Sequence, residues 1–108
     1  MFLRFEYMMT RDRIREELDG VDKIIFKAFE QRLALSREMA KWKLASGDET
    51  CDPARESEMI EARVAEFYGI DPDEVKGLQR YLIEAGKRTQ EDLRRRYNDW
   101  TGSVLLPQ

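Results

Sequence analysis

The sequence predicts an all-α fold of three helices: one long, one short and one of medium length. Apolar residues recur every three or four positions through most of the 108 residues, and no stretch alternates as a half-buried strand would. Helix start and stop signals divide this pattern near residues 47–52 and 69–71. The length suits a single core, so we expect one domain at residues 11–98, between an N-terminal extension (1–10) and a C-terminal tail (99–108).

The longest helix is predicted from Arg13 to Ser46, with Thr10 as its cap, Asp12 in its first turn and Gly47 at its end. Its apolar residues follow steps of mostly four and three, typical of a helix that packs lengthwise against another. They are Ile14, Leu18, Val21, Ile25, Ala28, Leu35 and Met39. A second apolar row widens this face, and it consists of Phe26, Phe29, Leu33 and Ala40. The helix therefore needs more than one neighbour.

Two further helices follow polar connections. Asp52 and Pro53 provide a capping side chain and a proline at the first helical position, which predicts a short helix ending near residues 68–69. The third helix is predicted from Asp71 to about Asn98, and we expect the tail after it to be loosely ordered. Gly86 lies inside this helix at a cost of about 1 kcal/mol relative to alanine, which indicates a place where a side chain must be absent.

The composition excludes several kinds of chemistry. Histidine is absent and Cys51 is the only cysteine, so imidazole metal sites, Ser-His-Asp triads, disulfides and thiolate zinc sites are excluded, and we expect no metal and no cofactor. The 19 basic and 22 acidic residues are intermixed, which argues against a nucleic-acid partner. Residues 1–9 are apolar but interrupted by charges and too short to span a bilayer, so we expect no membrane association and a cytoplasmic protein.

One residue breaks the apolar spacing of the long helix. Arg32 falls on its apolar face, where an unpaired guanidinium would cost several kcal/mol, so an anion should meet it. Lys43 lies eleven residues later, which places the two cations within about 20° of each other and roughly 16 Å apart along the helix. Both could contact one small ligand.

Arg15 cannot reach that ligand from the same helix, because it lies about 25 Å from Arg32 and is rotated by roughly 100°. If two long helices pair antiparallel, Arg15 of one chain is carried toward the site of the other. This arrangement gives two equivalent sites per two-fold dimer, each built from both chains. We therefore predict an obligate homodimer.

Six short elements, taken in order and spacing, resemble the all-helical class of chorismate mutases over about residues 11–96. They are Ile14-Arg15, Val21-Asp22, Gln31-Arg32, Lys41-Trp42-Lys43, the run from Asp52 to Glu56, and Thr89-Gln90. The resemblance implies an intertwined homodimer that rearranges chorismate to prephenate, in the biosynthesis of phenylalanine and tyrosine. This intramolecular reaction needs no nucleophile, metal or general base.

The resemblance also implies roles for single residues. Arg32 and the partner's Arg15 would hold the two substrate carboxylates, while Lys43 and Gln90 would donate to the ether oxygen. Glu56 would accept from the ring hydroxyl, with Asp52 near it, and Arg55 would line the pocket. Relatives often have a small hydroxyl residue where Gly86 stands, so one hydrogen bond to a carboxylate is in doubt and we expect a higher Michaelis constant.

Taken singly, these residues have plainer explanations. Arg32 could snorkel or be ion-paired, Lys43 and Arg15 could be solvated, and Arg55 could pair with a neighbouring acid. Asp52 and Glu56 also suit a helix start, and Gln90 could lie on the surface. Because all seven residues occur together on three helices, a shared substrate site is favoured over these separate explanations.

Other functions stay open at this point. An isochorismate pyruvate lyase is disfavoured by Glu56, whereas a mutase acting on the 4-amino analogue of chorismate is not excluded. A non-catalytic dimerisation or regulatory module has no reason to keep a charge on its apolar face. A nucleic-acid binder using Arg94, Arg95 and Arg96 would show affinity that falls steeply with salt.

Overall fold

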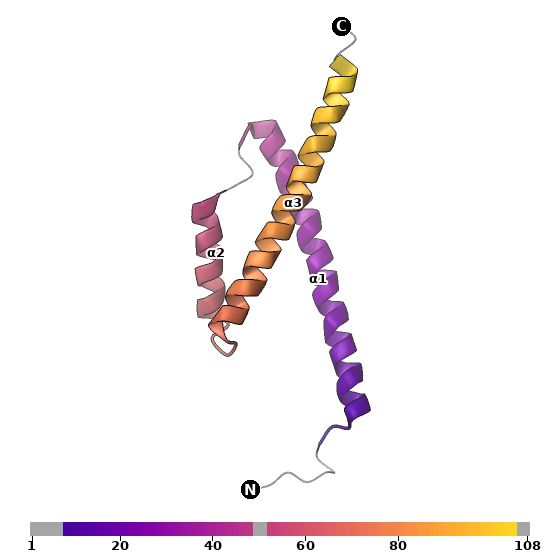
Figure 1. Cartoon of the computed structure of the whole chain (residues 1–108), viewed down its shortest axis with the longest axis vertical. Helices are drawn as coiled ribbons and strands as arrows, with labels where there is room; N and C mark the ends of the chain where they lie inside the picture. Colours follow the sequence, from indigo (N-terminus) through magenta and orange to yellow (C-terminus); the bar gives the residue numbers. More distant parts are fainter. Residues whose placement is uncertain (1–7, 49–51, 106–108) are drawn as a thin grey trace. The chain divides into compact units, whose positions relative to one another are not determined.

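The computed structural model describes residues 8–48 and 52–105, and the side chains among them up to residue 100. These residues form three helices and no strand: α1 (Arg11–Ser46), α2 (Pro53–Glu66) and α3 (Pro72–Leu105) (Figure 1). The predicted all-α fold is confirmed. None of the helices in the described part of the chain has an apolar stretch that could cross a bilayer. Cys51 and the start of the predicted N-terminal extension lie outside the described residues.

The chain divides into two units, residues 1–31 and 32–108. In the described part of the first unit, α1 begins at Arg11, two residues before the predicted Arg13, and Thr10 is its cap as predicted, since the Thr10 hydroxyl accepts a hydrogen bond from the backbone N–H of Arg13 at 3.1 Å. The predicted apolar row of this segment is exposed along its length, and its large members are Ile14, Leu18, Val21 and Ile25. This segment therefore presents an apolar face that no described residue buries.

The second unit contains the buried core. In it, α2 packs against α3, and the part of α1 that begins at Arg32 crosses α3 (Figure 1). The buried apolar side chains are Ala40, Val75, Ile83 and Ala85. Gly86 lies where α1 and α3 cross, and a Cβ atom there would be 2.8 Å from the Ser36 hydroxyl oxygen. A side chain at residue 86 would therefore require the Ser36 hydroxyl to move, which agrees with the prediction that a side chain is absent here.

Local signals determine where these helices begin and end. The Asp52 carboxylate accepts from the backbone N–H of Arg55 at 3.1 Å, so α2 begins at the predicted cap. Gly47 adopts a φ of 78°, which favours glycine, and its N–H donates to the Lys43 carbonyl as α1 ends. The Asp71 carboxylate accepts from the N–H of Asp73 at 2.8 Å, at the start of α3.

Two predicted helix ends were wrong. Helix α2 ends at Glu66, slightly before the predicted residues 68–69. Helix α3 continues past Asn98 to Leu105, so it has 34 residues against 36 in α1 and is not of medium length. No proline interrupts the chain between Pro72 and Pro107, and one glycine near a helix end costs only about 1 kcal/mol, so turn-forming residues alone do not stop α3.

Candidate active site

A cavity of about 390 Å³ lies within the second unit, between the end of α1, the start of α2 and the middle of α3. Its volume is in the range of small-molecule sites. Six of the seven predicted site residues line it: Arg32, Lys43, Asp52, Arg55, Glu56 and Gln90. Residues far apart in the sequence are thus brought to one place. Arg15 belongs to the first unit, and its approach from a second chain stays a prediction.

The charges around this cavity suit an anionic ligand. Four cations line it, Arg32, Lys43, Arg55 and Lys87, against the two carboxylates of Asp52 and Glu56, which leaves a formal charge of +2. A dianion of small size would balance this charge. Apolar contacts from Leu35, Met39 and Ile83 complete the lining, as is usual for a site that binds an organic molecule.

Arg32 is the cation at the crossing of α1 and α3. Its Nη1 donates to the Leu82 carbonyl at 2.6 Å, and no carboxylate among the described residues pairs with it. Burial lowers the pKa of Arg32, and the nearby positive charge of Arg63 lowers it further. Both causes disfavour the charged form, although arginine stays protonated. A ligand carboxylate would therefore compensate for the desolvation of the Arg32 guanidinium and for the nearby charge of Arg63.

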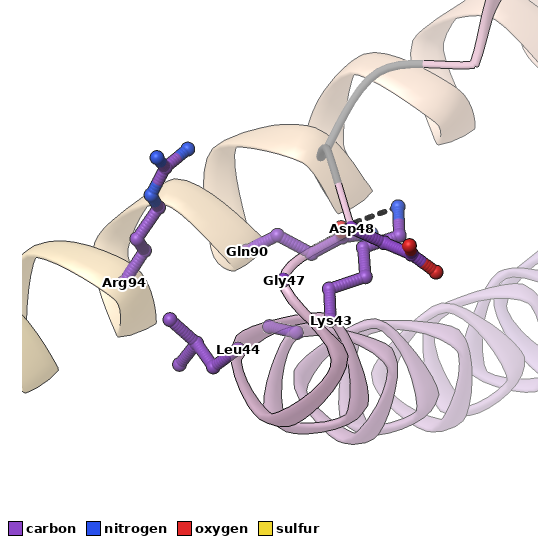
Figure 2. Close-up of a pocket in the computed structure, with 7 residues that line it drawn as sticks. Lys43, Leu44, Gly47, Asp48, Gln90 and Arg94 are labelled. Atoms are coloured by element: carbon purple, nitrogen blue, oxygen red, sulfur yellow. Dashed lines mark hydrogen bonds between the residues drawn. The ribbon is translucent and has the colours of Figure 1, made fainter.

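Lys43 and Gln90 form a pair across the cavity. The Lys43 ammonium on α1 donates to Gln90 Oε1 on α3 at 3.2 Å, the dashed bond in Figure 2. Because the amide oxygen of Gln90 accepts from Lys43, its NH₂ group is the end that can donate to a ligand. Two donors from different helices can therefore approach the same acceptor atom.

The neighbouring opening, of about 120 Å³, extends from this pair toward the end of α1 (Figure 2). Its lining includes Asp48 and Arg94, and in the view shown Arg94 points away from the Lys43–Gln90 bond. Arg94 and Arg95 each pair with an acid three residues earlier, Glu91 at 3.7 Å and Asp92 at 2.5 Å. These two arginines therefore have acidic neighbours on the exposed surface of α3.

The start of α2 supplies the acidic side of the cavity. Asp52 caps the helix, and Glu56 one turn later accepts from the Lys87 ammonium at 3.4 Å. Arg55 lines the cavity and also lies 3.8 Å from Glu58, so its plainer explanation, pairing with a neighbouring acid, is present as well. Asp52 and Glu56 are therefore placed together as acceptors.

Sequence reasoning missed two lining residues. Lys87 bridges Glu56 and Glu84, at 3.4 Å from each carboxylate. Its position three residues before Gln90 puts both side chains on one face of α3, and this spacing is the signal that could have found it. Ser36 follows Arg32 by one turn of α1 and also lines the cavity, but a serine within a helix has no sequence pattern that marks it as a site residue.

A further cavity, of about 470 Å³, lies between α2 and α3. It is lined mostly by apolar side chains, with Arg63 and Glu74 as its ionised residues. These two formal charges cancel, so this cavity lacks the cations that a dianion requires.

Comparisons with known proteins identify the family. The family model described as chorismate mutase type II matches residues 14–91, which include Arg15 and all six predicted site residues in the cavity. Neither the search of curated proteins nor the search of solved structures found a match. Since the family match covers most of the chain, the protein belongs to the chorismate mutase type II family.

Proposed function

We propose that this protein is a chorismate mutase, which converts chorismate to prephenate by forming a carbon–carbon bond and breaking a carbon–oxygen bond within one molecule. The observation that carries the proposal is the single cavity in which Arg32, Lys43 and Gln90 meet from two helices. Its formal charge of +2 matches the two carboxylates of chorismate.

The first task of the site is to fix the reactive conformer. The enolpyruvyl arm of chorismate must fold over the ring, and holding it there supplies part of the rate. Arg32 would bind one carboxylate, in two-point fashion where geometry permits, and the partner's Arg15 would bind the other. The partial burial of Arg32 strengthens such a contact, because less water competes with it than at an exposed arginine.

The second task is to stabilise the transition state. As the carbon–oxygen bond stretches, negative charge gathers on the ether oxygen, and donors held in place there stabilise the transition state more than the substrate. Lys43 and the Gln90 NH₂ group are the donors, and the two side chains already meet, with Lys43 Nζ 3.2 Å from Gln90 Oε1. Glu56 and Asp52 would accept from the ring hydroxyl and so fix the orientation of the ring.

The proposal includes a homodimer with shared sites. The exposed apolar row of α1 between Ile14 and Ile25 supports it, because a second copy would bury surface that a single chain leaves in water. We assign the reaction to phenylalanine and tyrosine biosynthesis in the cytoplasm.

The direct test is to follow loss of chorismate and to identify the product. Prephenate is the expected product, whereas pyruvate with an aromatic acid would identify a lyase and overturn the proposal. No turnover by a folded dimer would indicate a non-catalytic module. The 4-amino analogue is assayed in parallel, because Glu56 could accept from an amino group as well as from a hydroxyl; a strong preference for the analogue would reassign the substrate.

A pair of lysine variants sharpens this test. Lys43→Ala should lower kcat by about 100-fold or more, the cost of losing one donor to the developing charge, with the dimer intact. Lys41→Ala is the matched control, since Lys41 is exposed on the same helix and pairs with Glu38 at 3.0 Å. An unchanged kcat in Lys43→Ala would contradict the role of Lys43 at the ether oxygen.

A further inference from the structure

The crossing of α1 and α3 places a hydroxyl where a side chain of residue 86 would lie. A Cβ atom built on Gly86 would be 2.8 Å from Ser36 Oγ and 3.2 Å from Arg32 Nη1. The first distance is too short for a real contact, so the Ser36 hydroxyl occupies that space. The hydroxyl and the guanidinium therefore converge on one point at the crossing.

Ser36 is also available for a ligand. It lines the charged cavity together with Arg32 and Gln90, and its residue surface is only 9% exposed. Within the part of the chain that the structure describes, its hydroxyl makes no hydrogen bond. No fully buried side-chain oxygen or nitrogen among the described residues lacks a partner, so the Ser36 hydroxyl is open toward the cationic cavity, where a ligand atom can supply its hydrogen bond.

We propose that Ser36 is a substrate-binding residue, whose hydroxyl donates to the same substrate carboxylate that Arg32 holds. The proposal rests on the function proposed above. It follows from the helix geometry, because residues 32 and 36 lie one turn apart on the same face of α1. Gly86 has no hydroxyl to donate to the substrate carboxylate, but Ser36 on the facing helix would make this hydrogen bond instead. The KM for chorismate would then not be raised by the glycine.

A purely structural role for Ser36 makes a different prediction. If Ser36 only allows the helices to approach, alanine should serve equally well, because it is smaller and the crossing requires no hydroxyl. If Ser36 binds the carboxylate, Ser36→Ala should raise the KM for chorismate by about tenfold or more, the usual effect of losing a hydrogen bond to a charged group. Its kcat should stay within about twofold, since the ether-oxygen donors are untouched.

A swap of the hydroxyl between helices separates these explanations. In Ser36→Ala/Gly86→Ser the clashing oxygen is gone, and the remaining Cβ of residue 36 is 3.7 Å from the new Cβ, an ordinary contact. The new hydroxyl starts beside Arg32, so the swap should restore most of the lost affinity. Ser36→Ala/Gly86→Ala is the matched control, which fills the same space without a hydroxyl and should keep the raised KM.

The experiment measures kcat and KM for chorismate with the full chain and these three variants, with melting temperatures to show that each folds. A wild-type KM in Ser36→Ala, or a swap variant no better than its alanine control, would overturn the assignment of Ser36 while the proposed function stands. A wild-type chain that does not convert chorismate would overturn both. If Ser36→Ala fails to fold, Ser36→Cys and Ser36→Gly provide the comparison, and an unchanged KM in both would again overturn the assignment.

Discussion

At the scale of single residues, Arg32 lines the charged cavity at a cost to the free energy of folding. A pKa lower in the folded chain than in the unfolded one means that the folded state favours the charged side chain less. Burial is the main cause, and no described carboxylate compensates for it. A residue that costs folding free energy and lines the charged cavity is typical of a binding site.

Replacement of Arg32 by methionine should therefore separate stability from activity. We expect Arg32→Met to keep or raise the free energy of unfolding, since a similar apolar stem replaces a desolvated charge. Its kcat/KM should fall by about 100-fold or more, because a carboxylate loses its charged partner. Urea unfolding at one fixed protein concentration and steady-state kinetics measure the two effects. Arg37→Met, an exposed change on the same helix, is the control; a large loss of stability in Arg32→Met alone would show that Arg32 is structural.

Gln90 leads to a prediction about pH. A neutral amide donates at any pH, whereas a glutamate at this position donates only when protonated. The Lys43 ammonium, 3.2 Å from Gln90 Oε1, would hold the new carboxylate ionised. Gln90→Glu should therefore be poorly active at neutral pH and gain activity as the pH falls. Equal pH profiles for kcat in wild type and variant would contradict a donor role for Gln90.

At the scale of helices, capping chemistry and apolar spacing predicted the architecture. Thr10, Asp52 and Asp71 each accept the backbone hydrogen bond expected of a helix cap. The predicted end of α3 was too early, because the first strong stop signal after Asn98 is Pro107, two residues beyond the observed end at Leu105. Helix starts are encoded by specific side chains, whereas turn residues such as Thr101 and Gly102 do not by themselves end α3.

The glycines of α3 test the helix crossing. A Cβ at Gly77 meets nothing within 4 Å, whereas one at Gly86 meets the Ser36 hydroxyl. Gly77→Leu should be neutral or stabilise by up to about 1 kcal/mol, the gain in helix propensity. Gly86→Leu should destabilise by about 1–3 kcal/mol through overpacking and should abolish binding in the cavity. Thermal unfolding of the two variants checks this; equal effects would show that α1 and α3 do not approach at Gly86.

The candidate site was predictable to the extent that its residues follow helical spacing or the family pattern. Arg32 was conspicuous because a charge stood on an apolar face, and six predicted residues do share one cavity. Ser36 and Lys87 were not predictable, since a serine or lysine within a helix is ordinary until the facing helix is in place. What they do depends on the crossing with another helix, and a single sequence does not show that crossing.

At the scale of the whole molecule, the proposed active site requires a second chain. The first unit presents Ile14, Leu18, Val21 and Ile25 to solvent, and it carries the one predicted cation that the cavity of the second unit does not contain. Pairing of two copies would bury the apolar row and bring the partner's Arg15 toward the site. Stability and catalysis would then both depend on protomer concentration.

The most direct measurement is complementation between two inactive variants, Arg15→Ala and Arg32→Ala. Each homodimer lacks one essential cation in both of its sites. When the two are refolded together, every mixed dimer regains one intact site, and random pairing should restore roughly a quarter of the wild-type chorismate mutase activity. No recovery from the mixture, although mixed dimers form, would contradict a site built from two chains.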